Sequence, residues 1–292
     1  MFDYPALIAL AEVLRTGSFE QAAHALHVTP SAISQRIKSL EERIGAPLVR
    51  RGQPCTGTET GQRLARHAEQ VRLLEQDLAL APQASAERAR PAVIRIAVNA
   101  DSLASWLIPA LAATPSGTLF DLEIDDQDHC DDWLARGDVW AAVTANPAPL
   151  AGCDTLPLGR LRYIATASPE FIAQHFPQGV TAQALATAPS LIFNAKDRLQ
   201  AQWAKLATGT NAPLPAHTLP SPQAFLEAAR AGLGWGVNIE AMARADLAAG
   251  RLRALSPQPL DVALYWKTLR VMKAPLAPLT AAIRKAAAEG LI

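Results

Sequence analysis

Small polar and basic side chains share one face of a short segment near the start of the chain, HVTPSAISQRIKSLEERIG, residues 27–45. A glutamine offers a paired donor and acceptor that can read an adenine edge, and serine hydroxyls can bond base edges or phosphates. Basic side chains suit phosphate oxygens, which position a protein on DNA without reading sequence. The chemistry predicted is contact with double-stranded DNA, through Thr29, Pro30, Ser31, Ser34, Gln35, Arg36 and Lys38.

A second set of polar residues follows the ends of predicted strands later in the chain. Asn99–Ser102 run from a strand into a helix, whose exposed N–H groups suit a carboxylate. Acidic side chains near the same edge suit an ammonium or guanidinium group, so the pattern fits an amino acid with a cationic side chain. The candidate ligand-binding residues are Asn99, Ala100, Asp101, Ser102, Asp125, Asp126, Ala145, Asn194, Trp235 and Asn238.

Plainer interpretations of these residues stay open. Asp101 or Ser102 could serve only as a helix cap, and Asp125 and Asp126 could be solvated loop charges. Asn194 could be a turn residue that needs no ligand. The run GLGWG, residues 232–236, is no phosphate cradle, because it follows a helix and enters a strand, the reverse of the order required.

Composition bounds the function. The chain has 292 residues, half of them hydrophobic, which is enough for two or three packed units. Its 27 basic and 27 acidic side chains cancel, so any DNA binding must be local rather than a bulk electrostatic coating. Three widely spaced cysteines, Cys55, Cys130 and Cys153, argue against a disulfide framework or zinc site and favour a reducing compartment.

Other classes of protein find little support. Asp3 and Glu12 stand where a secretory signal would carry basic residues, and no apolar run is long enough to span a bilayer. We therefore expect a cytoplasmic protein without a membrane partner. The histidines lack metal-ligand spacing and no GxSxG motif occurs, so neither a metal, a cofactor nor an enzyme activity is predicted.

The first eighty residues have the pattern of packed helices. Gly17 ends the first helix, Ser18 caps the second, and Thr29 with Pro30 begins the third. The first helix is expected to bury Tyr4, Leu7, Ile8, Leu10, Ala11 and Leu14, and the third Ile33, Ile37, Leu40 and Ile44. Three short helices with a tight turn before the last predict a helix-turn-helix. The alternative is a solvated face on an ordinary helical bundle.

The next segment predicts a wing and then a long helix. Arg50 and Arg51 precede a Gly/Pro-rich loop, which fits a wing along the DNA backbone or in the minor groove; the alternative is a plain basic loop. Thr58 caps a helix with a short coiled-coil-like seam, which indicates a dimer: Leu64, Ala68, Val71, Leu74 and Leu78. Residues 81–91, APQASAERARP, are interpreted as a hinge or linker.

From residue 92 onward strands alternate with helices. Segments 92–98, 119–125 and 139–145 have strand patterns, with helical segments between them. The alternation continues to a last helix at about residues 278–289. It predicts an α/β domain with a largely parallel sheet.

The segment FEQAAHALHVTPSAISQRIKSLEERIGAPLVRR, with TGTETG after it, resembles the N-terminal domain of the LysR-type transcriptional regulators. AVNADSLASWLIPAL and ISQRIKSLE are similar to its ArgP/LysG/IciA-like branch, which regulates arginine and lysine export. The resemblance implies a winged helix-turn-helix at 1–60, a linker and dimerisation helix with a hinge at 61–90, and an effector-binding α/β domain at 91–292. That domain would have two periplasmic-binding-protein-like subdomains, one at about 91–161 and 269–292 and the other at about 162–268.

The resemblance also implies how such a chain would act. A small effector, lysine or arginine, would close the subdomains of a homodimer or homotetramer on its DNA operator, with RNA polymerase as a further partner, at an amino-acid exporter gene. Two departures stand out. Many members have arginine where this chain has Gln53, so the side chains expected to enter the minor groove are Arg50 and Arg51 instead. Many members also have proline where this chain has Asn238. The alternatives are an α/β enzyme or a solute-binding protein with a helical oligomerisation arm.

Overall fold

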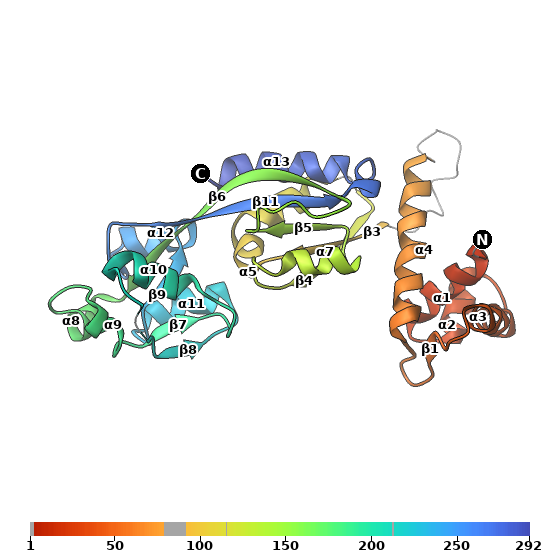
Figure 1. Ribbon diagram of the computed structural model, residues 1–292, viewed down its shortest axis with the longest axis horizontal. Coiled ribbons are helices and arrows are strands. Elements are labelled where there is room, and N and C mark those ends of the chain that lie inside the picture. The colour runs from red at the N-terminus through yellow and green to blue at the C-terminus, as the bar shows by residue number, and fades with distance from the viewer. Residues whose placement is uncertain (1–2, 79–91, 115, 212) are drawn as a thin grey trace. The chain divides into compact units, whose positions relative to one another are not determined.

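The computed structural model describes residues 3–78, 92–114, 116–211 and 213–292, and the chain forms two compact units (Figure 1). Unit 1 is Met1–Ala92 and unit 2 is Val93–Ile292. The predicted hinge at 81–91 lies outside the described residues.

Unit 1 begins with three helices, α1 (Tyr4–Thr16), α2 (Phe19–Leu26) and α3 (Pro30–Ile44). Local chemistry sets their ends as the sequence predicts. Gly17 ends α1 with a φ of 68°, a left-handed conformation that glycine adopts without strain. The Ser18 hydroxyl accepts from the Gln21 N–H at 3.3 Å, and the Thr29 hydroxyl accepts from the Ala32 N–H at 3.2 Å.

Burial in unit 1 follows the prediction for α3 but not for α1. Ile33, Ile37 and Leu40 are buried on α3. On α1 the expected face was wrong at two positions, because Tyr4 and Ile8 are 40% and 45% exposed. The helix instead turns its small residues inward, where α2 and α3 pack closely: Ala6, Ala9 and Val13 are buried with Leu7 and Leu10.

A short antiparallel hairpin, β1 (Val49–Arg50) with β2 (Thr56–Gly57), forms the predicted wing. It leads into α4 (Glu59–Leu78), and Thr58 caps that helix by accepting from the Gly61 N–H at 3.1 Å. The Glu41 carboxylate ties α3 to the wing by accepting from the Leu48 N–H at 2.7 Å.

The predicted dimer seam on α4 is partly used within the chain. Leu64 and Ala68 pack in the cluster of Leu7 and Leu10 on α1. Val71 and Leu74 remain half-buried, and the side chain of Leu78 lies outside the description. The part of the seam left for a second chain is therefore shorter than the sequence pattern indicates.

Unit 2 contains a sheet with the strand order β10-β6-β11-β5-β3-β4, and β9 also pairs with β6. β3 runs parallel to β5, whereas β11 and β6 pair antiparallel with their neighbours. The predicted parallel pairing thus holds within parts of the sheet only. The strands are β3 (Ala92–Val98), β4 (Thr118–Ile124), β5 (Ala141–Thr144), β6 (Cys153–Ala167), β7 (Ser190–Ile192), β8 (Ala216–Thr218), β9 (Gly236–Ile239), β10 (Arg253–Ala254) and β11 (Leu260–Leu269).

Two long strands, β6 and β11, run through both halves of unit 2 (Figure 1). One end of their ladder joins β5; at the other end β6 pairs with β9 and β10. We call the half with β3–β5 subdomain I and the half with β7–β10 subdomain II. The helices of subdomain I are α5 (Ala100–Ser102), α6 (Ile108–Ala112), α7 (Cys130–Arg136) and α13 (Ala277–Gly290); those of subdomain II are α8 (Pro169–His175), α9 (Ala182–Leu185), α10 (Leu199–Thr208), α11 (Pro222–Arg230) and α12 (Glu240–Ala248).

The first helical segment of unit 2 contains a π-helical turn, η2 (Leu103–Leu107), between α5 and α6. Pro109 explains it, because proline has no N–H to donate and its ring displaces the carbonyl four residues earlier. The segment starts at Ala100, after the extended residue Asn99, which places both Asp101 and Ser102 inside the helix. The alternative that Asp101 or Ser102 serves only as the cap of this helix was wrong, because Asn99 holds the cap position.

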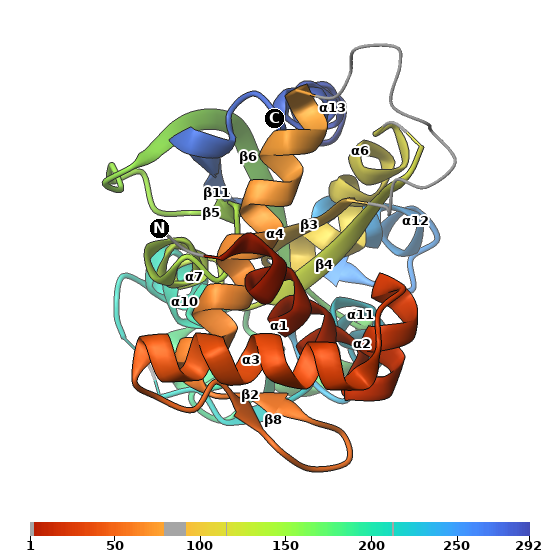
Figure 2. The same cartoon turned by 90° about the vertical axis from the view of Figure 1, so that its right-hand side faces the viewer.

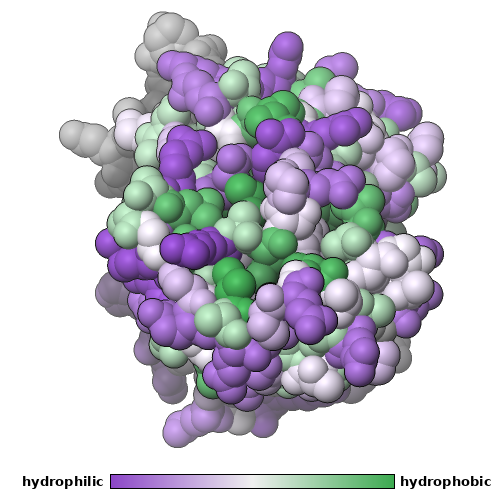
Figure 3. Space-filling model, turned by 90° about the vertical axis from the view of Figure 1, so that its left-hand side faces the viewer, coloured by the Kyte–Doolittle hydropathy of each residue, from purple (hydrophilic) through white to green (hydrophobic). Residues whose placement is uncertain are grey.

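At the surface, the end of unit 2 that carries α8 and α9 shows apolar side chains near its centre and polar ones around them (Figure 3). Within the described part of the chain, no helix has both the length and the apolar character needed to cross a bilayer.

The junction of α4 with the wing gives a first prediction. A Cβ at Gly61 would lie 2.0 Å from the Leu48 carbonyl oxygen, which is backbone and has little room to move. Gly61→Ala should therefore loosen unit 1 and abolish the DNA binding predicted from the sequence, measured by gel shift, while the ligand binding predicted for unit 2 persists. Thr60→Ala, at the exposed neighbouring position, is the control and should behave as wild type. Normal DNA affinity in Gly61→Ala would contradict the close approach.

Candidate functional site

The polar face of α3 lies at the surface of unit 1, with the wing beside it (Figure 2). Ser31, Gln35 and Lys38 are exposed, and Ser34 and Arg36 are half-buried. At the N-terminal end, the exposed Thr29 and Pro30 begin the helix, and the Thr29 and Ser31 hydroxyls lie 2.9 Å apart. The helix is slim here, as entry into a major groove about 12 Å wide requires.

The two wing arginines differ in their surroundings. Both are exposed, but the Arg51 guanidinium lies 5.6 Å from the centre of the Phe19 ring, a cation–π contact with α2. Arg50 lies on β1. All the predicted DNA-contacting residues therefore belong to α3, its cap and the wing.

The candidate effector site lies between the subdomains of unit 2. A pocket there is lined by Asp101 from subdomain I and, from subdomain II, by Phe193, Pro222, Phe225, Val237, Asn238, Ile239 and Met242. Asp101 and Asn238 are the predicted ligand residues that it brings together. Asn238 is buried, and its amide donates to the Thr166 hydroxyl at 2.9 Å, which holds it on β9.

Asp101 is the carboxylate that faces this pocket. The Tyr163 hydroxyl, from the crossing strand β6, donates to its Oδ2 at 2.8 Å. Burial raises the pKa of Asp101 to about 6; the Tyr163 hydrogen bond opposes the shift, and the charges of Asp197 and Asp126 add to it. The ionised form of the Asp101 carboxylate is therefore disfavoured, both by its burial and by the negative charges near it.

Unsatisfied polar atoms lie next to Asp101. Ser102 is fully buried, and its hydroxyl has no hydrogen-bond partner among the described residues. Asn99 is also buried; its amide donates to Gln127 Oε1 at 3.4 Å, while its own Oδ1 finds no described partner. Ala100 completes this first turn and is half-buried. Buried polar atoms without partners are uncommon and suit a position where a ligand supplies the missing bond.

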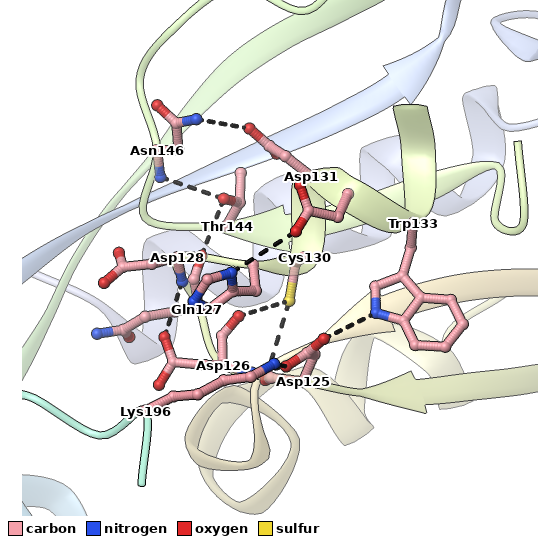
Figure 4. A network of polar contacts seen from close by, with 12 residues as sticks. Asp125, Asp126, Gln127, Asp128, Cys130, Asp131, Trp133, Thr144, Asn146 and Lys196 are labelled. Carbon is pink, nitrogen blue, oxygen red and sulfur yellow. Dashed lines mark hydrogen bonds and ion pairs between the residues drawn. The ribbon is translucent and has the colours of Figure 1, made fainter. Parts of the chain in front are cut away.

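Asp125 and Asp126 lie at the end of β4 and are not plain solvated charges (Figure 4). Asp125 accepts from Lys196 Nζ at 2.8 Å and from the Trp133 indole N–H at 3.0 Å. Although burial opposes the change, these bonds and that from the Asp126 N–H lower the pKa of Asp125. Asp126 accepts from the Asp128 N–H at 3.0 Å.

A buried ion pair supports the same rim of subdomain I. Lys267 on β11 is fully buried; its ammonium group donates to Asp131 Oδ2 at 2.6 Å and to the Ala148 carbonyl at 2.7 Å. The Asn146 amide donates to the same carboxylate oxygen at 2.9 Å. Breaking such a pair would leave a buried charge alone, so the network holds the loop after β5 against α7.

Three predicted residues, Trp235, Ala145 and Asn194, do not line the pocket. Trp235 is fully buried just before β9, with its ring 5.2 Å from that of Trp203, and its indole N–H has no hydrogen-bond partner among the described residues. The Ala145 N–H is already bonded to the Gln127 carbonyl at 3.0 Å. The Asn194 side chain accepts from the Lys196 N–H at 2.7 Å, which is the turn role left open above.

Three residues of the site, Tyr163, Lys196 and Asp197, are not predicted from the sequence. The Asp197 carboxylate accepts from the Phe193 and Leu199 N–H groups, and burial raises its pKa. Tyr163 lies inside β6, and no sequence pattern around it indicates a ligand contact. Lys196 lies 71 positions from Asp125, so only the fold brings them together.

Two family models cover this arrangement. A model described as bacterial regulatory helix-turn-helix protein, lysR family, matches residues 5–62, and one described as LysR substrate binding domain matches residues 88–288. The chain belongs to the LysR family of transcriptional regulators. The predicted winged helix-turn-helix followed by an α/β effector-binding domain is thereby confirmed.

Relatives place the chain on the ArgP/LysG side of the LysR family. The HTH-type transcriptional regulator ArgP of Pseudomonas fluorescens is 43% identical over 295 residues, which cover 100% of this chain and 98% of the relative. The crystal structure of ArgP from Mycobacterium tuberculosis matches with a TM-score of 0.82 and 42% identity, covering 100% of this chain and 99% of that one. Full-length LysG from Corynebacterium glutamicum with bound effector Arg matches at 0.68 and 36%, covering 99% of each chain. This LysR-family chain is a regulator of that type, not an enzyme.

The Asp101 carboxylate of this LysR-family chain gives a prediction for stability. The pKa of Asp101 is about 6 in the folded chain and 3.8 ordinarily, so the folded chain binds this proton more tightly than the unfolded chain does. The contribution of Asp101 to the free energy of unfolding therefore falls as the pH rises from about 4 to 6. At about 1.4 kcal/mol per pKa unit, Asp101→Asn should stabilise unit 2 by on the order of 3 kcal/mol at pH 7.5, and by little at pH 4.

Urea unfolding followed by tryptophan fluorescence checks this, because all six tryptophans lie in unit 2. Asp132→Asn, which removes an exposed carboxylate from α7, is the control and should change stability by less than about 0.5 kcal/mol. A gain for Asp101→Asn that does not depend on pH would refute the assigned cause.

Proposed function

We propose that the chain docks α3 and the wing on an operator and senses a basic amino acid, lysine or arginine, in the cleft of unit 2. The target would be an amino-acid exporter gene, and the site of action the cytoplasm. The observation that carries the effector assignment is Asp101, a half-buried carboxylate that lines a pocket, with Asp126 and Asp197 adding negative charge around it. The Corynebacterium glutamicum LysG structure, with its effector Arg, supports the same ligand class.

The cleft offers complementary groups to both ends of such a ligand. The start of the helical segment at Ala100 and the unpartnered Ser102 hydroxyl would receive the α-carboxylate. The carboxylates of Asp101, Asp125 and Asp126 would receive the ammonium and the cationic side chain. A neutral amino acid would leave at least one of these acidic groups without a counter-charge.

Binding is proposed to act through closure of the two subdomains. An effector shifts such an equilibrium only by its difference in affinity for the two arrangements. Chains would pair along the half-buried part of α4 around Val71 and Leu74, and pairs of dimers would hold the operator. Closure would change the placement of the helix-turn-helix dimers, and with it DNA bending and contact with RNA polymerase.

The DNA part of the proposal is tested at Gln35. If its amide reads a base edge, Gln35→Ala should lose on the order of 1–3 kcal/mol of discrimination between operator variants, because the paired donor and acceptor disappear. Competitive gel shifts with single-base operator variants measure this. Gln70→Ala, which removes the same side chain from α4, is the matched control. If Gln35→Ala ranks the operator variants as wild type does, Gln35 is not a reader.

The effector part is tested by calorimetry with arginine, lysine and a neutral amino acid. Ser102→Ala should weaken arginine and lysine binding about three- to tenfold, as expected for one hydrogen bond, and leave effector-free DNA affinity unchanged. Thr114→Ala removes a hydroxyl already bonded to the Ala110 carbonyl and is the control. Unchanged affinity in Ser102→Ala removes Ser102 from the site, and absence of arginine and lysine binding to the wild type overturns the effector assignment.

A further inference from the structure

An ion pair joins the two subdomains of unit 2. Lys196, from the turn after β7 in subdomain II, places its Nζ 2.8 Å from Asp125 Oδ1 at the end of β4 in subdomain I (Figure 4). The lysine side chain is 50% exposed and the aspartate 20%. The bond therefore joins a firmly placed carboxylate to a cation that can leave into solvent.

The two partners differ in how they are held. Asp125 stays in place without the lysine, because its carboxylate also accepts from the Trp133 indole at 3.0 Å and from the Asp126 N–H at 2.8 Å, both within subdomain I. The backbone of the lysine turn is equally well defined: the Asp197 carboxylate accepts from the N–H groups of Phe193 at 2.9 Å and Leu199 at 3.0 Å. Only the flexible stem of Lys196 is free to move.

Charge around the pair favours a cation at this position. The negative charges of Asp126 and Asp132, besides the bond to Asp125, raise the pKa of Lys196, so its side chain is an ammonium at any physiological pH. The same carboxylates would attract any other cation that enters the cleft. Two cations cannot share the position that the Lys196 ammonium occupies on Asp125 Oδ1, since that oxygen already accepts from the Asp126 N–H.

We propose that Lys196 is an internal competitor for the effector: its ammonium occupies the Asp125 carboxylate that the cationic side chain of the effector must take. This inference rests on the proposed function. Release of Lys196 exchanges one ion pair for another, so a basic amino acid replaces the charge it displaces. A neutral amino acid would leave Asp125 without a counter-charge beside Asp126, and is therefore rejected. Lys196 thus contributes to specificity for basic amino acids and raises the concentration of effector needed for response.

Lys196→Met tests the competition, since it keeps the length of the stem and removes the charge. Calorimetry on the full chain should show arginine and lysine binding about two- to fivefold more tightly than to wild type, the range that one exposed ion pair represents. Citrulline, the neutral analogue of arginine, should gain nothing. Arg198→Met removes the same charge from an exposed position two residues away and should leave all affinities unchanged. Thermal unfolding confirms that each variant is folded.

The partner of the lysine provides a second measurement. Asp125→Asn should weaken arginine and lysine binding, and Lys196→Met in that background should bring no gain, because the contested carboxylate is gone. Equal or weaker arginine binding in Lys196→Met overturns the competition, weaker binding meaning that Lys196 touches the effector instead. A wild-type chain that binds neither arginine nor lysine overturns the proposed effector first, and the competition with it, so the two failures are distinguishable.

Discussion

The antiparallel ladder of β6 and β11 joins the halves of unit 2, and the position of every cleft residue depends on it. β6 is 15 residues long, pairing with β11 through Tyr163 and then with β9 and β10. Register shifts between Leu264 and Tyr265, opposite Gly159, whose φ is 134°. Such an irregularity bends the strand locally and increases its twist, and the Arg160 N–H beside it donates to the Ile292 carbonyl at 2.8 Å.

Tyr163 connects this ladder to the Asp101 carboxylate in the cleft. It lies where β6 passes from one partner strand to the other, pairing with both Leu260 and Ile239, and its hydroxyl bonds Asp101 across the cleft. In subdomain I, the buried Lys267–Asp131 pair and Asn146 hold the loop after β5 against α7. A change of charge at Asp101 would therefore act on β6 directly, through the Tyr163 hydrogen bond.

The sequence predicts features that depend on residues close together in the chain, and it does not predict those that depend on residues far apart. Ser18, Thr29 and Thr58 cap helices through bonds three residues away, so the order of elements in unit 1 is readable. Pro157 and Gly159 interrupt the strand pattern over the first half of β6, so the length of this strand is not readable from the sequence; both residues lie at the irregular point of the ladder. Strand ends point to Asp101 and Asn238, which line the same pocket, but the positions of Trp235 and Lys196 depend on tertiary packing, which leaves no local pattern.

The acidic cleft also shows why binding and stability oppose each other here. Asp101 and Asp197 have raised pKa values because burial and neighbouring carboxylates disfavour their charge, so the chain folds at neutral pH against that cost. Lys196 forms an ion pair with Asp125, and does so with a half-exposed side chain. A ligand that brings its own positive charge to Asp101 removes a penalty already present in the folded chain. Its affinity then comes partly from relief of repulsion, which a neutral ligand of the same shape cannot provide.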